Sequence, residues 1–258
     1  MKIKTILNLI LLALIGFIPA VHSNIIKNVC IPKINDIFNH LENLPKDEKT
    51  IAAFDMDDTL VTRAYNEENK IVETHKEGDK TANAVKELQD RNIETMILTA
   101  RLQGAGLSAD EGCRLLDRDK TREILGLEPY SDLGGEEEIA AKRKDAIIKY
   151  ADEMDIFFPR WQEYNPLKNS ELQSLRIPNN AGNCMLTKNN IVFAGGKKPV
   201  WKGKAMTVLI DKDMLKSSPN NILFIDDDKE NIEEFNNSFK DRPENVYLFH
   251  YPKDGICP

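Results

Sequence analysis

Residues 51–59 read IAAFDMDDT, an apolar run that ends abruptly in carboxylates. A second stretch of the same kind, residues 222–228, reads ILFIDDD. Short apolar runs without alternation are typical of strands that are buried on both faces of a sheet. Further runs of this type occupy residues 95–98, 191–194 and 246–249. The sequence therefore predicts a sheet that is covered on both sides.

Segments between these runs carry apolar residues at helical spacing. The pattern occurs in residues 34–44, 82–89, 139–154 and 205–215, and at Ile232, Phe235 and Phe239. Strands that alternate with helices predict an α/β fold with a doubly wound, Rossmann-like parallel sheet. In such a sheet, ligands bind beyond the carboxyl ends of the strands. We therefore expect the acids that follow residues 51–54 and 222–225 to converge on one spot.

The composition limits the class of protein. A chain of 258 residues has room for one large α/β domain, and 41% hydrophobic with 30% charged residues excludes wholesale disorder and several membrane spans. The net charge is −7, and no long basic block offsets it. Nucleic-acid binding is not expected, because it requires positive charge to neutralise phosphates.

The first 23 residues are typical of a secretory signal peptide. Lys2 and Lys4 precede the apolar run ILNLILLALIGFIPA of residues 6–20, which is too short to span a bilayer. Cleavage after Ser23 would leave residues 24–258 with a net charge of −9. We therefore expect an exported protein, periplasmic or secreted, with no membrane attachment after cleavage.

Four cysteines lie in this mature part: Cys30, Cys113, Cys184 and Cys257. None forms a C-x-x-C pair, which argues against a zinc ribbon or a thioredoxin-type redox site. In an oxidising compartment the even count allows two disulfides, and we favour Cys30–Cys257, which would tie the mature ends together. The alternative is four buried thiols.

The region from about residue 103 to 183 is longer than a crossover helix requires. It contains aromatic residues such as Trp161 and Tyr164 and several prolines. We interpret it as a partly helical cap inserted into a single domain, residues 24–258, where it could cover the site. The polar segment of residues 62–80 could do the same. The aromatic residues could stack on a substrate or pack the small core of the insertion.

Four short motifs resemble those of the haloacid-dehalogenase-like (HAD) superfamily of phosphatases. In order they are FDMDDTL (54–60), LTAR (98–101), WKGK (201–204) and FIDD (224–227). The first looks like the family's D-x-D-x-T motif, and the others are similar to its strand-end threonine, its helix-opening lysine and its paired acids. With the signal peptide, the chain looks like the exported, largely uncharacterised bacterial branch of that superfamily.

The resemblance implies a Mg²⁺-dependent phosphomonoester hydrolase that acts through an aspartyl-phosphate. Asp55 would attack phosphorus, and Asp57 would protonate the leaving oxygen and later deprotonate water. Thr99 would donate a hydrogen bond to the phosphoryl group. The lysine would be Lys202, with Lys204 as the alternative. The expected partner is a small phosphorylated substrate.

The same resemblance implies a metal site formed by Asp55, the backbone carbonyl of Asp57, Asp226 and Asp227. Three carboxylates and a substrate phosphate would repel one another strongly in a closed pocket. Mg²⁺ prefers octahedral oxygen ligands and, with one lysine, would offset that charge. Asp228 is expected to begin a helix near the positive end of its dipole.

Other interpretations remain. Residues 57–59 could only cap a helix, and residues 226–228 could be a solvated turn. An EF-hand is excluded because the loop that would start at Asp55 has Leu60 where glycine is needed, and no P-loop motif occurs. The alternative functions are an exported binding or host-interaction protein without turnover, and a phosphotransferase that uses an alcohol acceptor.

Overall fold

The computed structural model describes residues 27–42, 44–45, 47–65, 71–100, 160–176, 184–194 and 201–257. In chain order the strands are β1 (Lys27–Cys30), β2 (Thr50–Phe54), β3 (Val61–Tyr65), β4 (Ile71–His75), β5 (Glu94–Thr99), β6 (Gln173–Arg176), β7 (Cys184–Lys188), β8 (Ile191–Phe193), β9 (Asn221–Asp226) and β10 (Asn245–His250). Eight of them form one sheet in the order β1-β10-β9-β2-β5-β8-β7-β6, and β3 pairs with β4 separately. The fold class is therefore α/β, as predicted.

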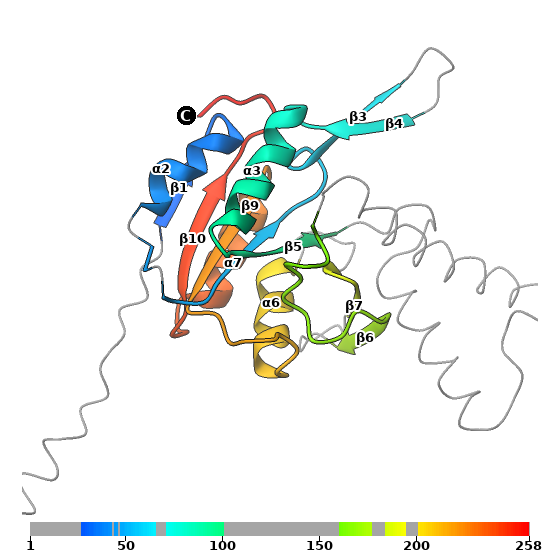
Figure 1. The fold of residues 1–258 in the computed structure, drawn as a ribbon, viewed down its shortest axis with the longest axis vertical. Helices are drawn as coiled ribbons and strands as arrows, with labels where there is room; N and C mark the ends of the chain where they lie inside the picture. The colour runs from blue at the N-terminus through cyan, green and yellow to red at the C-terminus, as the bar shows by residue number, and fades with distance from the viewer. Residues whose placement is uncertain are drawn as a thin grey trace, which may run out of the picture.

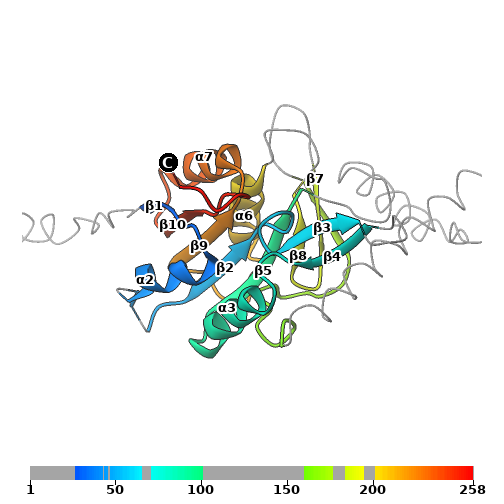
Figure 2. The ribbon, with the colours of Figure 1, turned by 90° about the horizontal axis from the view of Figure 1, so that it is seen from above.

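Helices cover both faces of the eight-stranded sheet (Figures 1 and 2). A 3₁₀ turn η1 (Ile34–Ile37), α2 (Phe38–Leu41) and α3 (Asp79–Asp90) lie on one face, and α6 (Lys202–Asp211) and α7 (Lys229–Phe239) lie on the other. Among the described residues, the helices are those predicted from periodicity. The helix expected over residues 139–154 lies outside the described residues.

Alternation along each strand builds two separate cores. In β9, Ile222 and Phe224 face α6 and α7, whereas Leu223 and Ile225 face η1 and α3. All six residues of this strand are buried. A strand that is buried on both sides needs apolar residues at every position, which explains the uninterrupted apolar runs in the sequence.

The sheet is mostly parallel. The ladder from β1 through β10, β9, β2 and β5 to β8 is parallel throughout, whereas β7 pairs antiparallel with β8 and β6 antiparallel with β7. The antiparallel pair at one edge was not predicted, since β6 and β7 lack a long apolar run. The expectation of an all-parallel sheet is corrected to this extent.

Part of the predicted cap contacts the main sheet. Residues 160–176, which lie within the predicted cap of residues 103–183, belong with the main sheet. Trp161 is buried in the core beneath α3, and the Thr95 N–H donates to the Tyr164 carbonyl (2.9 Å). The two aromatic residues therefore pack on the fold. The rest of the predicted cap, residues 103–159 and 177–183, lies outside the described residues.

A tight turn follows β2 and leads into the β3–β4 hairpin. Asp58 has a φ of 55°, in the left-handed region, and its N–H donates to the Val61 carbonyl (2.8 Å). The hairpin projects beyond the sheet, on the side where β2 ends (Figure 1). The polar segment of residues 62–80, which was interpreted as a possible cover of the site, thus contains most of this hairpin and the start of α3.

A disulfide joins Cys30 to Cys257, as predicted, across 227 positions of sequence. Cys30 ends β1, and Cys257 lies in the segment that follows β10. Because β1 pairs with β10, the bond fastens two chain ends that the sheet already brings together. Cys113 lies outside the described residues, so the second pair that the even count allows stays a prediction.

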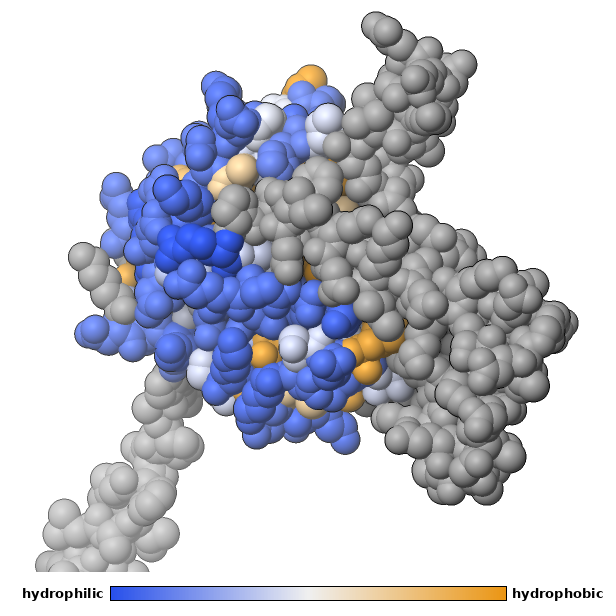
Figure 3. All heavy atoms as spheres, turned by 45° about the vertical axis from the view of Figure 1, so that its right-hand side comes forward, coloured by the Kyte–Doolittle hydropathy of each residue, from blue (hydrophilic) through white to orange (hydrophobic). Residues whose placement is uncertain are grey.

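Residues 1–26 also lie outside the described residues, and the signal peptide with them. No helix in the described ranges combines the length and the apolar character that crossing a bilayer requires. On the face shown in Figure 3, the surface of the described residues is mainly hydrophilic.

Candidate active site

The two acidic segments meet where the strand order reverses. From β2 the chain proceeds to β5 and β8 on one side, and it then returns to β9 and β10 on the other side. Such a reversal leaves a crevice at the carboxyl ends of the two central strands. Asp55 directly follows β2, and Asp226 is the last residue of β9. The Asp55 N–H donates to the Ile225 carbonyl (2.8 Å), so the two strand ends are in register.

Lys202 bridges these two acids. Its Nζ donates to Asp55 Oδ1 at 2.5 Å and to Asp226 Oδ2 at 2.6 Å. The lysine and both carboxylates are buried, the lysine at 1% exposure. Lys202 is the first residue of α6, so the long side chain reaches from a helix start to the strand ends. We call this arrangement the lysine bridge.

Asp227 completes an acidic cluster with Asp55 and Asp226. One carboxylate oxygen from each of the three lies within 4.8 Å of the others. The Asp227 N–H donates to Thr59 Oγ1 (3.1 Å), which ties the first acidic segment to the second. His250 Nε2 donates to the Asp227 carbonyl (3.1 Å) from the end of β10. Three neighbouring strands therefore fix the position of this residue.

Asp226 is surrounded by donors. Besides Lys202, it accepts from the Asp228 N–H (2.8 Å to Oδ1) and from Asn231 Nδ2 (3.1 Å to Oδ1 and 3.2 Å to Oδ2). A carboxylate has about four lone-pair sites, and these contacts use them. Asp228 caps α7, as predicted, by accepting from the Glu230 N–H (2.9 Å).

Burial and shared charge perturb the titration of the cluster. Burial raises the pKa of Asp55 to about 8, because Lys202 only partly offsets burial and Asp226 adds repulsion. Burial, with repulsion from Asp226 and Asp58, raises the pKa of Asp227 to about 6. For Lys202, burial alone would lower the pKa, but attraction to Asp226 and Asp55 outweighs it and raises the pKa. The lysine is thus charged and shared between two acids.

The cluster fits a hard divalent cation. Three carboxylates face one buried ammonium, which leaves an excess of two negative charges at neutral pH when all are ionised. Opposite ligands of Mg²⁺ are about 4.2 Å apart, and one oxygen of each of the three acids lies within 4.8 Å of the others. Asp55 and Asp227 suit this role best, because Lys202 occupies only Oδ1 of Asp55, whereas the donors around Asp226 engage both of its oxygens.

The remaining predicted site residues lie at the same rim. Asp57 is partly buried in the turn after β2, where its backbone forms an isolated β-bridge with that of Val61. Thr99 is buried at the carboxyl end of β5, the strand beside β2. Lys204, the alternative lysine, instead places its Nζ 4.0 Å from the centre of the Trp201 ring. Of the two lysines, the structure brings Lys202 to the acids.

A second lysine was not singled out from the sequence. Lys76 follows the β3–β4 hairpin, and its Nζ donates to the carbonyls of Tyr251 (3.2 Å) and Pro252 (3.0 Å). Burial lowers its pKa to about 8, although the nearby Asp227 and Asp58 favour its charged form. Lys253 pairs with Asp58 (2.7 Å). The segment after β10 therefore forms part of the rim.

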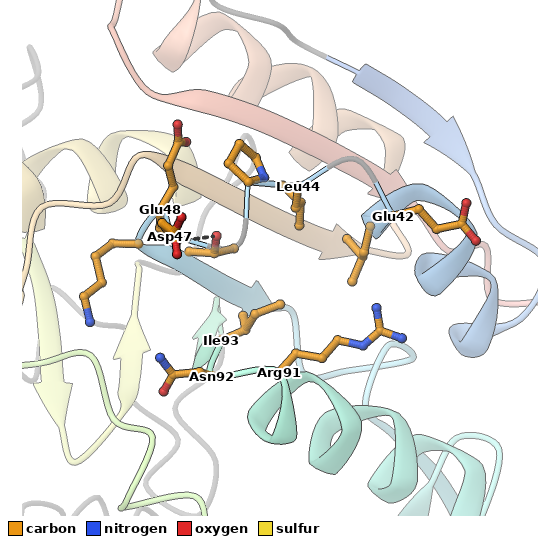
Figure 4. A pocket seen from close by; sticks show the side chains of 11 residues that line it. Glu42, Leu44, Asp47, Glu48, Arg91, Asn92 and Ile93 are labelled. Atoms are coloured by element: carbon orange, nitrogen blue, oxygen red, sulfur yellow. Dashed lines mark hydrogen bonds between the residues drawn. The ribbon is translucent and has the colours of Figure 1, made fainter.

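A cavity of about 730 Å³ lies at the opposite end of the strands from the acidic cluster. Figure 4 shows its lining, which includes Glu48 before β2 and Arg91, Asn92 and Ile93 before β5. These are the amino ends of the strands, so the cavity is remote from the acidic cluster. Size alone does not locate the chemistry of this protein.

The comparisons with known proteins add one match. Residues 162–254 are similar to a family described as a protein of unknown function, DUF2608. The matched range includes Lys202, Asp226 and Asp227, and it begins after Asp55. No curated protein and no solved structure matches the chain. Since this family carries no assigned activity, the geometry of the site has to support any function.

Proposed function

We propose that the protein is a Mg²⁺-dependent phosphomonoester hydrolase of the HAD type, which acts on a small phosphorylated substrate. The observation that carries this proposal is the lysine bridge, in which Lys202 holds Asp55 and Asp226 at the strand reversal beside Asp227. A buried carboxylate that is oriented by a cation is suited to nucleophilic attack on phosphorus. The order of the four sequence motifs supports the same assignment.

Asp55, Asp227 and the backbone carbonyl of Asp57 would hold the metal. Asp226 is the third carboxylate of the cluster, but its main part is to hold Lys202, because donors already surround it. When bound, Mg²⁺ would supply positive charge to the phosphoryl oxygens and lower the repulsion between substrate and acids. Lys202 would contribute a further positive charge to the phosphoryl group.

In the first step, Asp55 Oδ2 attacks phosphorus, since Lys202 engages Oδ1, whose second lone pair is left for the metal. The bond between phosphorus and the leaving oxygen breaks, and Asp57 gives that oxygen its proton. Thr99 donates a hydrogen bond to a phosphoryl oxygen. In the second step, water attacks the aspartyl-phosphate, Asp57 takes a proton from the water, and inorganic phosphate leaves with Asp55 restored.

Export is part of the proposal. Disulfides form and persist in oxidising compartments and are rare in the cytosol. The Cys30–Cys257 bond supports passage through such a compartment. The apolar run of residues 6–20 supplies the targeting signal for it. We therefore place the activity in the periplasm or outside the cell.

Release of p-nitrophenol from p-nitrophenyl phosphate tests the function. We expect turnover that requires Mg²⁺, stops on addition of EDTA and is lost in Asp55→Asn. Asp213→Asn is the matched control, because this exposed aspartate lies after α6, away from the acidic cluster, and asparagine tolerates the left-handed φ of this position. Turnover of that control should remain within about threefold of the wild type, as expected for a change outside the catalytic groups.

Two outcomes would redirect the assignment. No turnover over a broad panel of phosphomonoesters, with metal bound and the fold intact, would overturn the hydrolase and favour an exported binding or host-interaction protein. Formation of a phosphorylated alcohol when an acceptor such as glycerol is added would favour a phosphotransferase. Both outcomes are distinguishable from simple misfolding by circular dichroism and thermal melting.

A further inference from the structure

The amino end of α6 lacks a capping side chain of its own. Its N-cap residue is Trp201, which makes no side-chain hydrogen bond to the helix. The first backbone N–H groups of a helix have no partner inside the helix, and Ser, Thr, Asp or Asn usually accepts from them. Lys202 is the first residue of this helix, so the anchoring of the helix start determines where the lysine bridge begins.

Glu234 of α7 supplies the missing cap from another helix. Its Oε2 accepts from the Gly203 N–H (2.7 Å), and its Oε1 accepts from the Lys204 N–H (3.2 Å). Ser238, one turn further along α7, donates to the same Oε1 (2.9 Å). A carboxylate at this position also interacts favourably with the positive end of the helix dipole. The contact thus joins α7 to the residues that flank Lys202 on its carboxyl side.

Gly203 permits the close approach of the two helices. A Cβ at this position would lie 2.7 Å from the Phe235 Cα and 2.8 Å from the Ser238 Cβ, distances that real side chains do not adopt. The start of α6 is therefore pressed against the middle of α7. Any other residue at position 203 would move the helix start, and Lys202 with it.

The same helix holds the other end of the bridge. Asn231 of α7 donates to Asp226, and Glu234 lies three residues further on, so both side chains project from one face of the helix. Asp226 and Lys202 are thus each fixed from α7 and then bonded to each other. The result is a closed ring of contacts in which α7 sets the separation of the acid and the lysine.

We infer that Glu234 is a positioning residue for the proposed phosphatase, which holds the start of α6 so that Lys202 Nζ reaches Asp55 and Asp226. This inference rests on the proposed function for its kinetic consequence. The placement of Lys202 by Glu234 does not depend on the proposed function, because it follows from the contacts between the two helices. Glu234 is not a catalytic residue, because its carboxylate contacts the backbone of α6 and the Ser238 hydroxyl.

Steady-state kinetics with p-nitrophenyl phosphate and Mg²⁺ test the kinetic consequence. We expect Glu234→Leu to lower kcat about 10- to 100-fold with KM within about threefold, because misplacing a catalytic group by 1 Å can cost 10²-fold. Glu234→Gln should recover most of kcat, since the amide oxygen can still accept from the Gly203 N–H. Glu233→Gln, an exposed neighbour paired only weakly with Lys229 (3.8 Å), is the matched control and should leave kcat unchanged.

Nitrogen NMR of ¹⁵N-lysine-labelled protein tests the placement without any turnover. The buried, hydrogen-bonded ammonium of Lys202 should give a protected signal, which is assigned by its loss in Lys202→Met. We expect Glu234→Leu to shift or broaden this signal and Glu233→Gln to leave it in place. If Glu234→Leu does not fold, Ser238→Ala and Glu234→Asp, whose shorter carboxylate does not reach both N–H groups, replace it, and the Lys202 signal must then move further than in the control.

The outcomes separate the two proposals. A Lys202 signal that shifts in Glu234→Leu, together with a wild-type protein that shows no phosphatase turnover, would support the positioning role and overturn the function. An unshifted Lys202 signal, or a kcat within twofold of the wild type in a Glu234→Leu protein whose only change is a lower Tm, would overturn the inference and leave Glu234 with a structural role.

Discussion

Lys202 Nζ lies 2.6 Å from Asp226 Oδ2 and 2.5 Å from Asp55 Oδ1, in a place where solvent reaches almost none of the three side chains. One buried cation is therefore shared by two buried anions. Removing one member of a buried ion pair is far more disruptive than removing an exposed pair, because the charge that remains has no partner. The first two predictions follow from this asymmetry.

Replacing Lys202 by methionine should abolish activity and weaken the fold. We expect kcat to fall at least about 100-fold, since a preorganised group on the phosphoryl oxygens is lost. The free energy of unfolding should fall by about 3–5 kcal/mol, as is typical when a buried charge loses its partner. Urea denaturation and turnover assays measure the two effects. Lys204→Met, two positions away and packed on Trp201, should change neither by much; equal losses in both variants would contradict the assignment of Lys202.

Asp226 and Asp227 should respond differently to substitution by asparagine. Asp227→Asn removes a ligand with open coordination, so we expect Mg²⁺ affinity to fall at least about tenfold while stability without metal is retained or increased. Asp226→Asn removes the partner of Lys202 and should lower stability more than Asp227→Asn does. Isothermal titration calorimetry and thermal melting in EDTA make the comparison. A larger loss of metal affinity in Asp226→Asn would show that Asp226 is the principal ligand.

Stability without metal should depend on pH. The folded protein holds protons on Asp55 and Asp227 more tightly than the unfolded chain, because their pKa values are raised from 3.8 to about 8 and about 6. Their contribution to stability is greatest below the ordinary pKa and is lost as pH rises toward 8. We expect the urea midpoint in EDTA to fall between pH 5 and 8. Saturating Mg²⁺ should flatten this slope, and so should Asp55→Asn.

If the urea midpoint of the wild type in EDTA rises over the same interval, the cluster is not strained by its own charge. The argument for a cation at this place would then lose its electrostatic basis. The measurement is most informative when the protein is compared with Asp55→Asn in the same buffers, because other titrating groups contribute equally to both.

The disulfide should contribute strongly to stability. It closes a loop of 227 positions, and the chain-entropy argument gives such a bond about 5 kcal/mol. We expect Cys257→Ser to lower the free energy of unfolding by about that amount, and Cys30→Ser and the double variant to match it, since each breaks the same bond. Chemical denaturation with and without dithiothreitol measures the effect. A double variant that is much less stable than either single one would indicate another role for one cysteine.

The sequence predicted the centre of the sheet better than its periphery. Strands β2, β5, β8, β9 and β10 each contain an uninterrupted apolar run because both of their faces are buried, and this pattern is local. The β3–β4 hairpin, β6 and β7 lack such a pattern, since pairing with a neighbouring strand forms them. β1 was missed for the same reason, because its four residues are held at the sheet edge by β10.

The acids and Lys202 were predictable because each ends a strand or opens a helix, which is a feature of local sequence. The residues that hold these side chains in place were not predictable from the sequence. Asn231 and Glu234 look like ordinary polar positions on the helix that contains Ile232 and Phe235, and only the packing of α7 against α6 gives them a role. Thr59 lies within the first motif, but its hydrogen bond to the Asp227 N–H crosses 168 positions of sequence.

The pairing of β1 with β10 has a consequence for the folding of the protein. Residues near position 30 find their strand partner only when residues 245–250 are available, so this edge of the sheet cannot form without β10. Contacts of such large sequence separation are slow to form, because a long loop must be closed first. A chain that lacked its final dozen residues would leave the edge of β9 unpaired and prone to join other chains. The strand nearest the carboxyl terminus therefore shields β9 from pairing with other chains.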